Sequence, residues 1–101
     1  MLSYERILSA FADYLAADTG VEVVRTRHGY AFLTWDAMFR DWESVESCPT
    51  PEALLDRLTS SVEMYEQSRL LDGMREPTDA ECAVFAEAAE AYRRRCLEKQ
   101  A

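Results

Sequence analysis

The chain has 101 residues, of which 49% are hydrophobic and 11% aromatic, and its formal net charge at pH 7 is −8. Such a chain is too apolar to be intrinsically disordered, and its length suits a single domain over residues 1–101 with one modest core. The acidic charge disfavours direct binding to nucleic acids or anionic membranes, because attraction to phosphate supplies most of that affinity.

Residues 3–17 are predicted to form an amphipathic helix with Ser3 as its N-cap. Its apolar face would consist of Tyr4, Ile7, Leu8, Phe11, Tyr14 and Leu15. Acidic residues interrupt this apolar pattern, whereas a signal peptide needs an uninterrupted apolar core, so secretion is not expected. No run of 18 apolar residues occurs, which argues against a transmembrane helix. We therefore expect a cytoplasmic protein with no membrane partner.

Residues 21–35 are rich in β-branched and aromatic residues, which are typical of strands. His28-Gly29 lies between two apolar runs and is predicted to be the two-residue loop of a β-hairpin. The pairs expected on the core face are Val24 with Leu33 and Thr26 with Ala31. Those expected on the exposed face are Arg25 with Phe32 and Arg27 with Tyr30.

The segment 36–49 is compatible with two structures. Trp35, Phe39 and Trp42 are spaced i, i+4 and i+7, so we expect an irregular or short-helical segment capped by Asp36. The stretch WESVESC could instead form a third, edge strand. Residues 36–56 hold six carboxylates against one arginine, and the simplest interpretation of this charge is a solvated acidic surface.

Residues 50–72 and 78–98 are predicted to form two long helices. Thr50-Pro51 is typical of a helix start, Gly73 of a helix end, and Thr78 with Glu81 indicates a capping box. The expected apolar seams are Leu55, Leu58, Val62 and Tyr65, with Leu54 and Ser61 beside them, and Cys82, Phe85, Ala89, Tyr92 and Cys96. The short connection predicts that the two helices pack antiparallel.

The sequence lacks the spacing of known catalytic and metal-binding motifs. His28 is the only histidine, so a Cys–His pair would need Cys48, Cys82 or Cys96 to approach a hairpin turn. Three cysteines without a CxxC spacing argue against a zinc site and a disulfide framework. The glycines are isolated and the carboxylates show no EF-hand spacing. We predict no catalytic residues, no metal and no cofactor, and enzymatic acid–base chemistry by carboxylates is only a third functional class.

Two stretches, RHGYAFLTWD at 27–36 and TPEALLDRLTSSVEMYEQSRLLDG at 50–73, resemble small uncharacterised proteins carried on bacterial conjugative elements. They contain no mechanistic motif, so the resemblance assigns no role to any residue. It implies an accessory, non-housekeeping role in a bacterial cytoplasm.

We therefore predict an α+β fold with an N-terminal helix, a β-hairpin, the acidic segment and a C-terminal antiparallel helical hairpin. The predicted function is that of a non-enzymatic, acidic accessory or regulatory protein that binds another protein. Its partner surface would centre on Trp42 and Phe39 and be rimmed by Asp41, Glu43 and Glu46, because aromatic anchors hold interfaces together and rim charges steer association. The competing expectation places Trp42 in the core.

The sequence leaves two further alternatives open. The carboxylates of residues 36–56 could imitate nucleic-acid phosphates and occupy a basic cleft on a nuclease or DNA-binding protein. An unpaired hairpin edge invites a second chain, so the sequence is also compatible with a homodimer through strands or through the last helix.

Overall fold

The protein has the predicted α+β fold, with four helices and three strands over residues 2–98, the part of the chain that the computed structural model describes. The helices are α1 (Tyr4–Ala10), α2 (Ala12–Ala17), α3 (Pro51–Leu71) and α4 (Asp79–Leu97). The strands are β1 (Val21–Thr26), β2 (Gly29–Asp36) and β3 (Asp41–Cys48).

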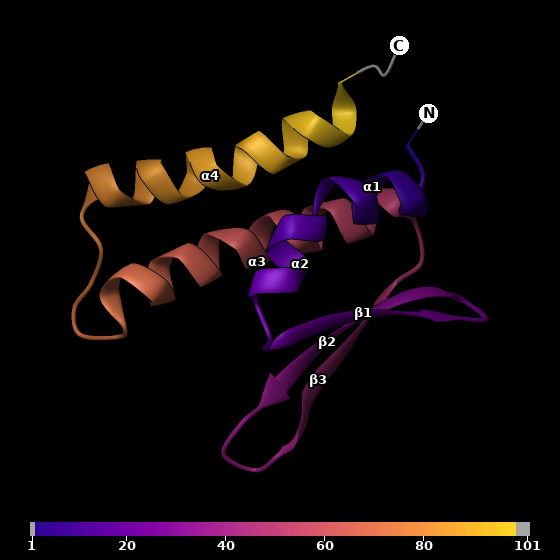
Figure 1. Ribbon diagram of the computed structural model, residues 1–101, viewed down its shortest axis with the longest axis horizontal. Coiled ribbons are helices and arrows are strands. Elements are labelled where there is room, and N and C mark those ends of the chain that lie inside the picture. Colours follow the sequence, from indigo (N-terminus) through magenta and orange to yellow (C-terminus); the bar gives the residue numbers. More distant parts are fainter. Residues whose placement is uncertain (1, 99–101) are drawn as a thin grey trace.

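Helix α3 lies between α4 and the sheet, and α1 lies beside it (Figure 1). The helices α3 and α4 run antiparallel, as predicted from their short connection. The sheet and the helices α1, α3 and α4 all contribute to one hydrophobic core. Its largest fully buried side chains are Ile7, Phe11, Phe32, Cys48, Leu54, Leu58, Val62 and Cys96. The position of the sheet therefore depends on how its inner face packs against α3 and α1.

The three strands form an antiparallel sheet in the order β1-β2-β3. The predicted first hairpin is present, but its loop is one residue earlier than expected, because Thr26 pairs with Gly29 and leaves Arg27-His28 as the turn. The Thr26 hydroxyl accepts a hydrogen bond from the His28 N–H at 3.1 Å, which stabilises this turn. Gly29 then begins β2 with a φ of 118°.

The expected faces of this hairpin are reversed. Phe32, predicted to be exposed, is only 1% accessible, and the Arg57 guanidinium of α3 lies 4.1 Å from its ring centroid. Because side chains alternate along a strand, Val24 and Leu33 lie on the opposite, outer face. The helices are all on the other side of the sheet (Figure 1). The alternating pattern alone could not choose between two faces that both carry apolar residues.

Within the segment 36–49, residues 37–40 form a turn and residues 41–48 form the edge strand β3, so the expected short helix is wrong and the alternative, a third strand, is right. Residues 41–48 pair with β2, from Asp36 opposite Asp41 to Tyr30 opposite Cys48. Trp35 and Trp42 are directly opposed across the two strands. The seven-residue separation of Trp35 and Trp42 therefore results from a hairpin with a short loop. The same separation also corresponds to two turns of a helix, which is why the sequence was compatible with both structures.

The N-terminal helix has the predicted Ser3 cap, whose side chain accepts a hydrogen bond from the Arg6 N–H at 3.2 Å. It is interrupted at Phe11, which has φ −96° and ψ 11°. The Phe11 ring is buried and stacks on Tyr92 of α4, with 5.1 Å between ring centroids. The predicted continuous helix over 3–17 is thus two short helices, and the break coincides with a buried aromatic contact.

The helical hairpin follows its sequence signals closely. The Thr50 hydroxyl caps α3, and α3 ends where Asp72 takes a left-handed conformation, one residue before Gly73. The predicted seam of α3 is buried or half-buried. In α4, Phe85, Ala89 and Cys96 of the predicted seam are buried, but Cys82 is exposed. The buried part of the helical hairpin ends at Leu71 and Phe85, and Cys82 lies beyond it, closer to the connecting loop.

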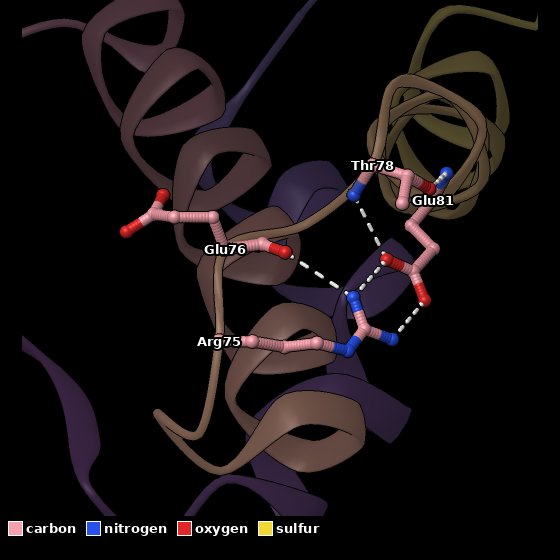
Figure 2. Close-up of polar contacts among 4 residues, drawn as sticks. All are labelled: Arg75, Glu76, Thr78 and Glu81. Atoms are coloured by element: carbon pink, nitrogen blue, oxygen red, sulfur yellow. Dashed lines mark hydrogen bonds and ion pairs between the residues drawn. The ribbon is translucent and has the colours of Figure 1, made fainter.

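The connection between α3 and α4 is held by Arg75 and Glu81 (Figure 2). The two guanidinium nitrogens of Arg75 donate to the two carboxylate oxygens of Glu81 at 2.8 and 2.6 Å. Glu81 also completes the predicted capping box by accepting from the Thr78 N–H at 2.9 Å. These hydrogen bonds, first from Arg75 and then from Thr78, lower the pKa of Glu81 to about 2.

Substitution of Gly29 is expected to destabilise the protein far more than substitution of its neighbour His28. A Cβ atom at Gly29 would meet the Tyr4 hydroxyl at 3.0 Å and the Cys48 carbonyl oxygen at 3.1 Å, and the positive φ adds strain. We expect Gly29→Val to lower the free energy of unfolding by at least about 2 kcal/mol. The control His28→Asn changes an exposed turn residue and should cost less than about 0.5 kcal/mol. Urea denaturation measures both free energies of unfolding. Equal losses in the two variants would mean that the β1–β2 hairpin does not have the register described.

Glu81→Gln is expected to destabilise the protein in a pH-dependent way. Since the pKa of Glu81 is lower in the folded chain than its usual value of 4.5, its stabilising charge is fully present above about pH 4.5 and is lost as the pH falls toward 2. The thermal midpoint should therefore drop at pH 7, and the difference from the unaltered protein should shrink below pH 4.5. The control is Glu76→Gln, whose carboxylate points away from Arg75 (Figure 2). A difference that is constant from pH 7 to 3 would contradict this assignment.

Candidate functional site

The loop between β2 and β3 is held by backbone and carboxylate groups. The Asp36 carboxylate accepts hydrogen bonds from the N–H groups of Met38 at 2.9 Å and Phe39 at 3.2 Å. The Arg40 N–H donates to the Asp36 carbonyl oxygen at 2.8 Å, and Arg40 has a left-handed φ of 57°. Asp36 thus caps a turn, in the manner of an Asx-turn, where the sequence suggested a helix cap. The polar groups of the loop therefore define its shape, and its apolar side chains are left at the surface.

Met38 and Phe39 project from this loop and are 83% and 76% exposed. Exposed apolar side chains this large are costly to hydrate, and when clustered they mark interaction surfaces. Since Asp36 already fixes the turn, neither side chain is needed to form it. We call residues 35–42 the hairpin tip.

Trp35 and Trp42 form the base of the hairpin tip. Their rings meet edge to face with 4.9 Å between centroids, a favourable geometry for two aromatic rings. They are 37% and 41% exposed, so Trp42 is not a core residue and the competing expectation for it is wrong. The strand register shifts beside this pair, leaving Glu43 as an extra residue in β3. Such a bulge bends an edge strand and redirects its side chains.

The structure brings together four of the five predicted partner-binding residues. Phe39, Asp41, Trp42 and Glu43 all lie in or next to the hairpin tip, and all are exposed. Glu46 lies further along β3, opposite Phe32, and its carboxylate accepts from the Arg57 guanidinium at 2.9 Å. Glu46 therefore contributes to the contact between the sheet and α3, and it lies apart from the other four residues.

Sequence reasoning missed the role of Trp35 as the direct partner of Trp42. The two rings contact one another through cross-strand pairing, and this pairing could have been found by testing residues 37–40 as a four-residue hairpin loop. It also missed Arg57, which joins the sheet to α3 by lying over the Phe32 ring and pairing with Glu46. The sequence gives little indication of this role, because an arginine in a long helix can equally well lie in solvent.

A shallow groove of about 260 Å³ continues from Trp35 toward α3. Its walls include Phe32, Thr34, Trp35, Arg57, Met64 and Tyr65. The volume is below the roughly 300–1,000 Å³ of typical small-molecule sites and is closer to that needed by one or two side chains of a partner. Trp35, at the base of the hairpin tip, is also part of the groove wall, whereas Met38, Phe39 and Trp42 are not.

The side chains of Asp18 and Ser61, which line this groove, are hydrogen-bonded within the fold. Asp18 accepts hydrogen bonds from the Tyr14 hydroxyl at 2.7 Å and the Gly20 N–H at 3.0 Å. The Tyr14 hydroxyl also contacts Ser61. Burial and the hydrogen bond with Asp18 raise the pKa of Tyr14, which stays protonated at neutral pH. The groove can therefore provide apolar contact, with its polar groups serving to hold the walls in place.

The cysteines and the histidine are arranged as packing and turn residues. Strand pairing brings Cys48 next to the first hairpin turn, but its thiol is buried and burial raises its pKa, so it is a poor nucleophile. Cys96 is likewise buried with a raised pKa, whereas Cys82 and His28 are exposed. Among residues 2–98, no cluster of three or more histidine, cysteine or carboxylate side chains could hold a metal ion.

The arginine run near the end of α4 is also used internally. Arg93 pairs with Asp56 of α3 at 3.0 Å, and Arg94 pairs with Glu87 at 2.6 Å. Arg95 donates to the Ala10 carbonyl oxygen at 3.2 Å and lies over the Tyr92 ring. These contacts account for all three charges without a nucleic-acid ligand.

Comparison with known proteins identifies no relative of this chain. No protein-family model, curated protein or solved structure matches this chain significantly. Separately, none of the helices within residues 2–98 has the length and apolar character needed to cross a membrane.

Removing the Asp36 carboxylate is expected to loosen the hairpin tip. Asp36→Ala loses both hydrogen bonds to the loop and should lower the free energy of unfolding by about 1 kcal/mol. Asp36→Asn retains an acceptor oxygen and should lose less than half as much. Tryptophan fluorescence during urea denaturation is a suitable measurement, since both tryptophans flank this loop. Equal losses in the two variants would mean that the acceptor oxygen does not hold the turn.

Proposed function

We propose that this protein is a non-enzymatic accessory or regulatory protein that binds another protein through its hairpin tip. The observation that carries the proposal is the exposure of Met38 and Phe39 on a turn held by Asp36, with the exposed Trp35–Trp42 pair at its base. A rigid aromatic surface loses little conformational entropy on binding, and tryptophan is among the commonest anchors of protein interfaces.

The charges around the tip support a steering role. Asp41 and Glu43 are exposed, and the chain as a whole is acidic. Exposed charges at the rim of an interface mainly change the association rate and the choice of partner. The partner surface is therefore expected to be basic around an apolar centre. The resemblance to proteins of bacterial conjugative elements leads us to propose this role for a bacterial cytoplasm.

The mimicry of nucleic acid has less support. A mimic needs a contiguous face of unpaired carboxylates, yet Glu46 pairs with Arg57 and Asp56 pairs with Arg93. Both carboxylates belong to the segment on which that alternative was based. Competition by nucleic acid for the captured partner would nevertheless favour mimicry over simple protein binding.

Alanine substitution at the hairpin tip is expected to reduce capture of the partner without unfolding the protein. The tagged protein and its Trp42→Ala and Phe39→Ala variants would be used to capture proteins from an extract of the organism that encodes it. Loss of an aromatic anchor typically costs at least about 2 kcal/mol, so the captured amount should fall at least about tenfold. The control is Met74→Ala, which removes an apolar side chain that is at least as exposed as Phe39 and Trp42 from the α3–α4 connection.

Charge reversal at Asp41 and Glu43 should slow association with the captured partner and flatten its salt dependence. Glu46 is left unchanged in this variant, because its replacement would also break the contact with Arg57. Circular dichroism establishes that each variant is folded. If the Trp42 and Met74 variants capture the same proteins in the same amounts, the hairpin tip is not the partner surface.

A further inference from the structure

Strand β3 has a free edge. Among residues 2–98 it pairs with β2 on one side only, and residues 41–47 are all exposed, Val45 to 66%. An edge strand presents a row of unpaired backbone donors and acceptors, which can bind a further strand. Strand addition of this kind is a common way for a protein to recognise an extended segment of another protein.

The register identifies the backbone groups that face this edge. The Trp35 N–H donates to the Gly20 carbonyl oxygen at 2.8 Å, so Trp35 directs its backbone groups toward the β1 side. Because direction alternates along a strand, Thr34, Phe32 and Tyr30 direct theirs toward β3. Their partners Ser44, Glu46 and Cys48 are therefore the residues bonded to β2.

The residues between these partners face the opposite way. Val45 and Ser47 direct their N–H and C=O groups toward the free edge, and their side chains lie on the outer face of the sheet with Leu33. The exposed edge thus offers two donors and two acceptors at the spacing of a β-ladder. An apolar side chain, that of Val45, lies between them.

The charge of this edge selects the incoming strand. β3 contains Asp41, Glu43 and Glu46 and no lysine or arginine. The Glu46 charge is balanced by Arg57, which leaves Asp41 and Glu43 near the tip end of the edge. Opposite charges across paired strands are stabilising and like charges are destabilising. A second copy of this chain would bring an equally acidic strand, so a basic strand is the better complement.

We infer that the free edge of β3 binds an extended basic segment of the partner protein by strand addition. This inference rests on the proposed protein-binding function and specifies the chemistry of the partner. The segment carries lysine or arginine where it passes Asp41 and Glu43 and an apolar residue beside Val45. Its backbone hydrogen-bonds to Val45 and Ser47, while the hairpin tip contacts neighbouring parts of the partner.

The experiment uses the full chain and a defined probe, an extended peptide of alternating lysine and valine of about nine residues. Amide hydrogen exchange is followed residue by residue by NMR. In the free protein the Val45 and Ser47 amides should exchange rapidly, and those of Ser44 and Glu46 slowly. With peptide, exchange at Val45 and Ser47 should slow by at least about tenfold, and higher salt should weaken the effect.

Two controls separate backbone pairing from simple charge attraction. The same peptide with N-methyl groups on both edges keeps its charge but cannot form a ladder, and it should give no protection. A peptide with glutamate in place of lysine should not bind. In the protein, Val45→Pro removes an edge-facing N–H and should abolish peptide binding, whereas Val45→Thr retains this donor and should bind normally. If Val45→Pro does not fold, the methylated peptide still decides the question.

Three results would overturn the inference: equal binding of the methylated or glutamate peptide, no protection of Val45 and Ser47, or protection that rises with protein concentration alone. The last result would identify a second copy as the occupant. The outcome is distinguishable from that of the proposed function. Protection by the lysine peptide together with normal extract capture by Trp42→Ala would retain the edge site and reject the hairpin tip. Capture that depends on Trp42 without peptide binding would do the reverse.

Discussion

The contact between Arg57 of α3 and Phe32 of β2 determines how the sheet is joined to the helices. The guanidinium covers the ring, and Glu46 holds the guanidinium from the neighbouring strand. An arginine can make both contacts at once because its planar, charged group stacks on aromatic rings while donating hydrogen bonds at its edge. With Phe32 turned toward α3, the outer face of the sheet is fixed, and so are the direction of the hairpin tip and the free edge of β3.

This arrangement places two candidate binding features on one strand. The hairpin tip is an aromatic surface that depends on a local turn, whereas the edge of β3 is a row of backbone groups that depends on strand register. Trp42 and Glu43 lie where the two features meet, next to the bulge. A partner could use the tip for affinity and the edge for alignment, because side-chain anchors and main-chain hydrogen bonds make separable contributions to recognition.

The predictions that succeeded concern local interactions. Thr50, Thr78 and Glu81 act within a few residues of their own position, so the starts of α3 and α4 could be read directly from the sequence. The sheet was harder to predict because its faces and register depend on residues far away in the chain. Phe32 is buried on account of α3, which begins 19 residues later.

The candidate site shows the same division between local and distant causes. Phe39 is exposed, as its predicted role requires, and that role stays a prediction. The ion pair of Glu46 was not foreseen because its partner Arg57 lies in another element. The preference for a helix failed because a spacing of seven residues suits both two helical turns and two paired strands around a short loop.

The distribution of the cysteines has a practical consequence for study of the native chain. Cys48 and Cys96 are buried, and Cys82 is the exposed thiol, on the first turn of α4. Since α3 separates α4 from the sheet (Figure 1), a maleimide dye on Cys82 is attached to a helix that is separated by α3 from the sheet carrying the tryptophan pair and the free strand edge. The chain thus carries its own attachment point for a fluorophore or for immobilisation on a surface, with the sheet left facing solution.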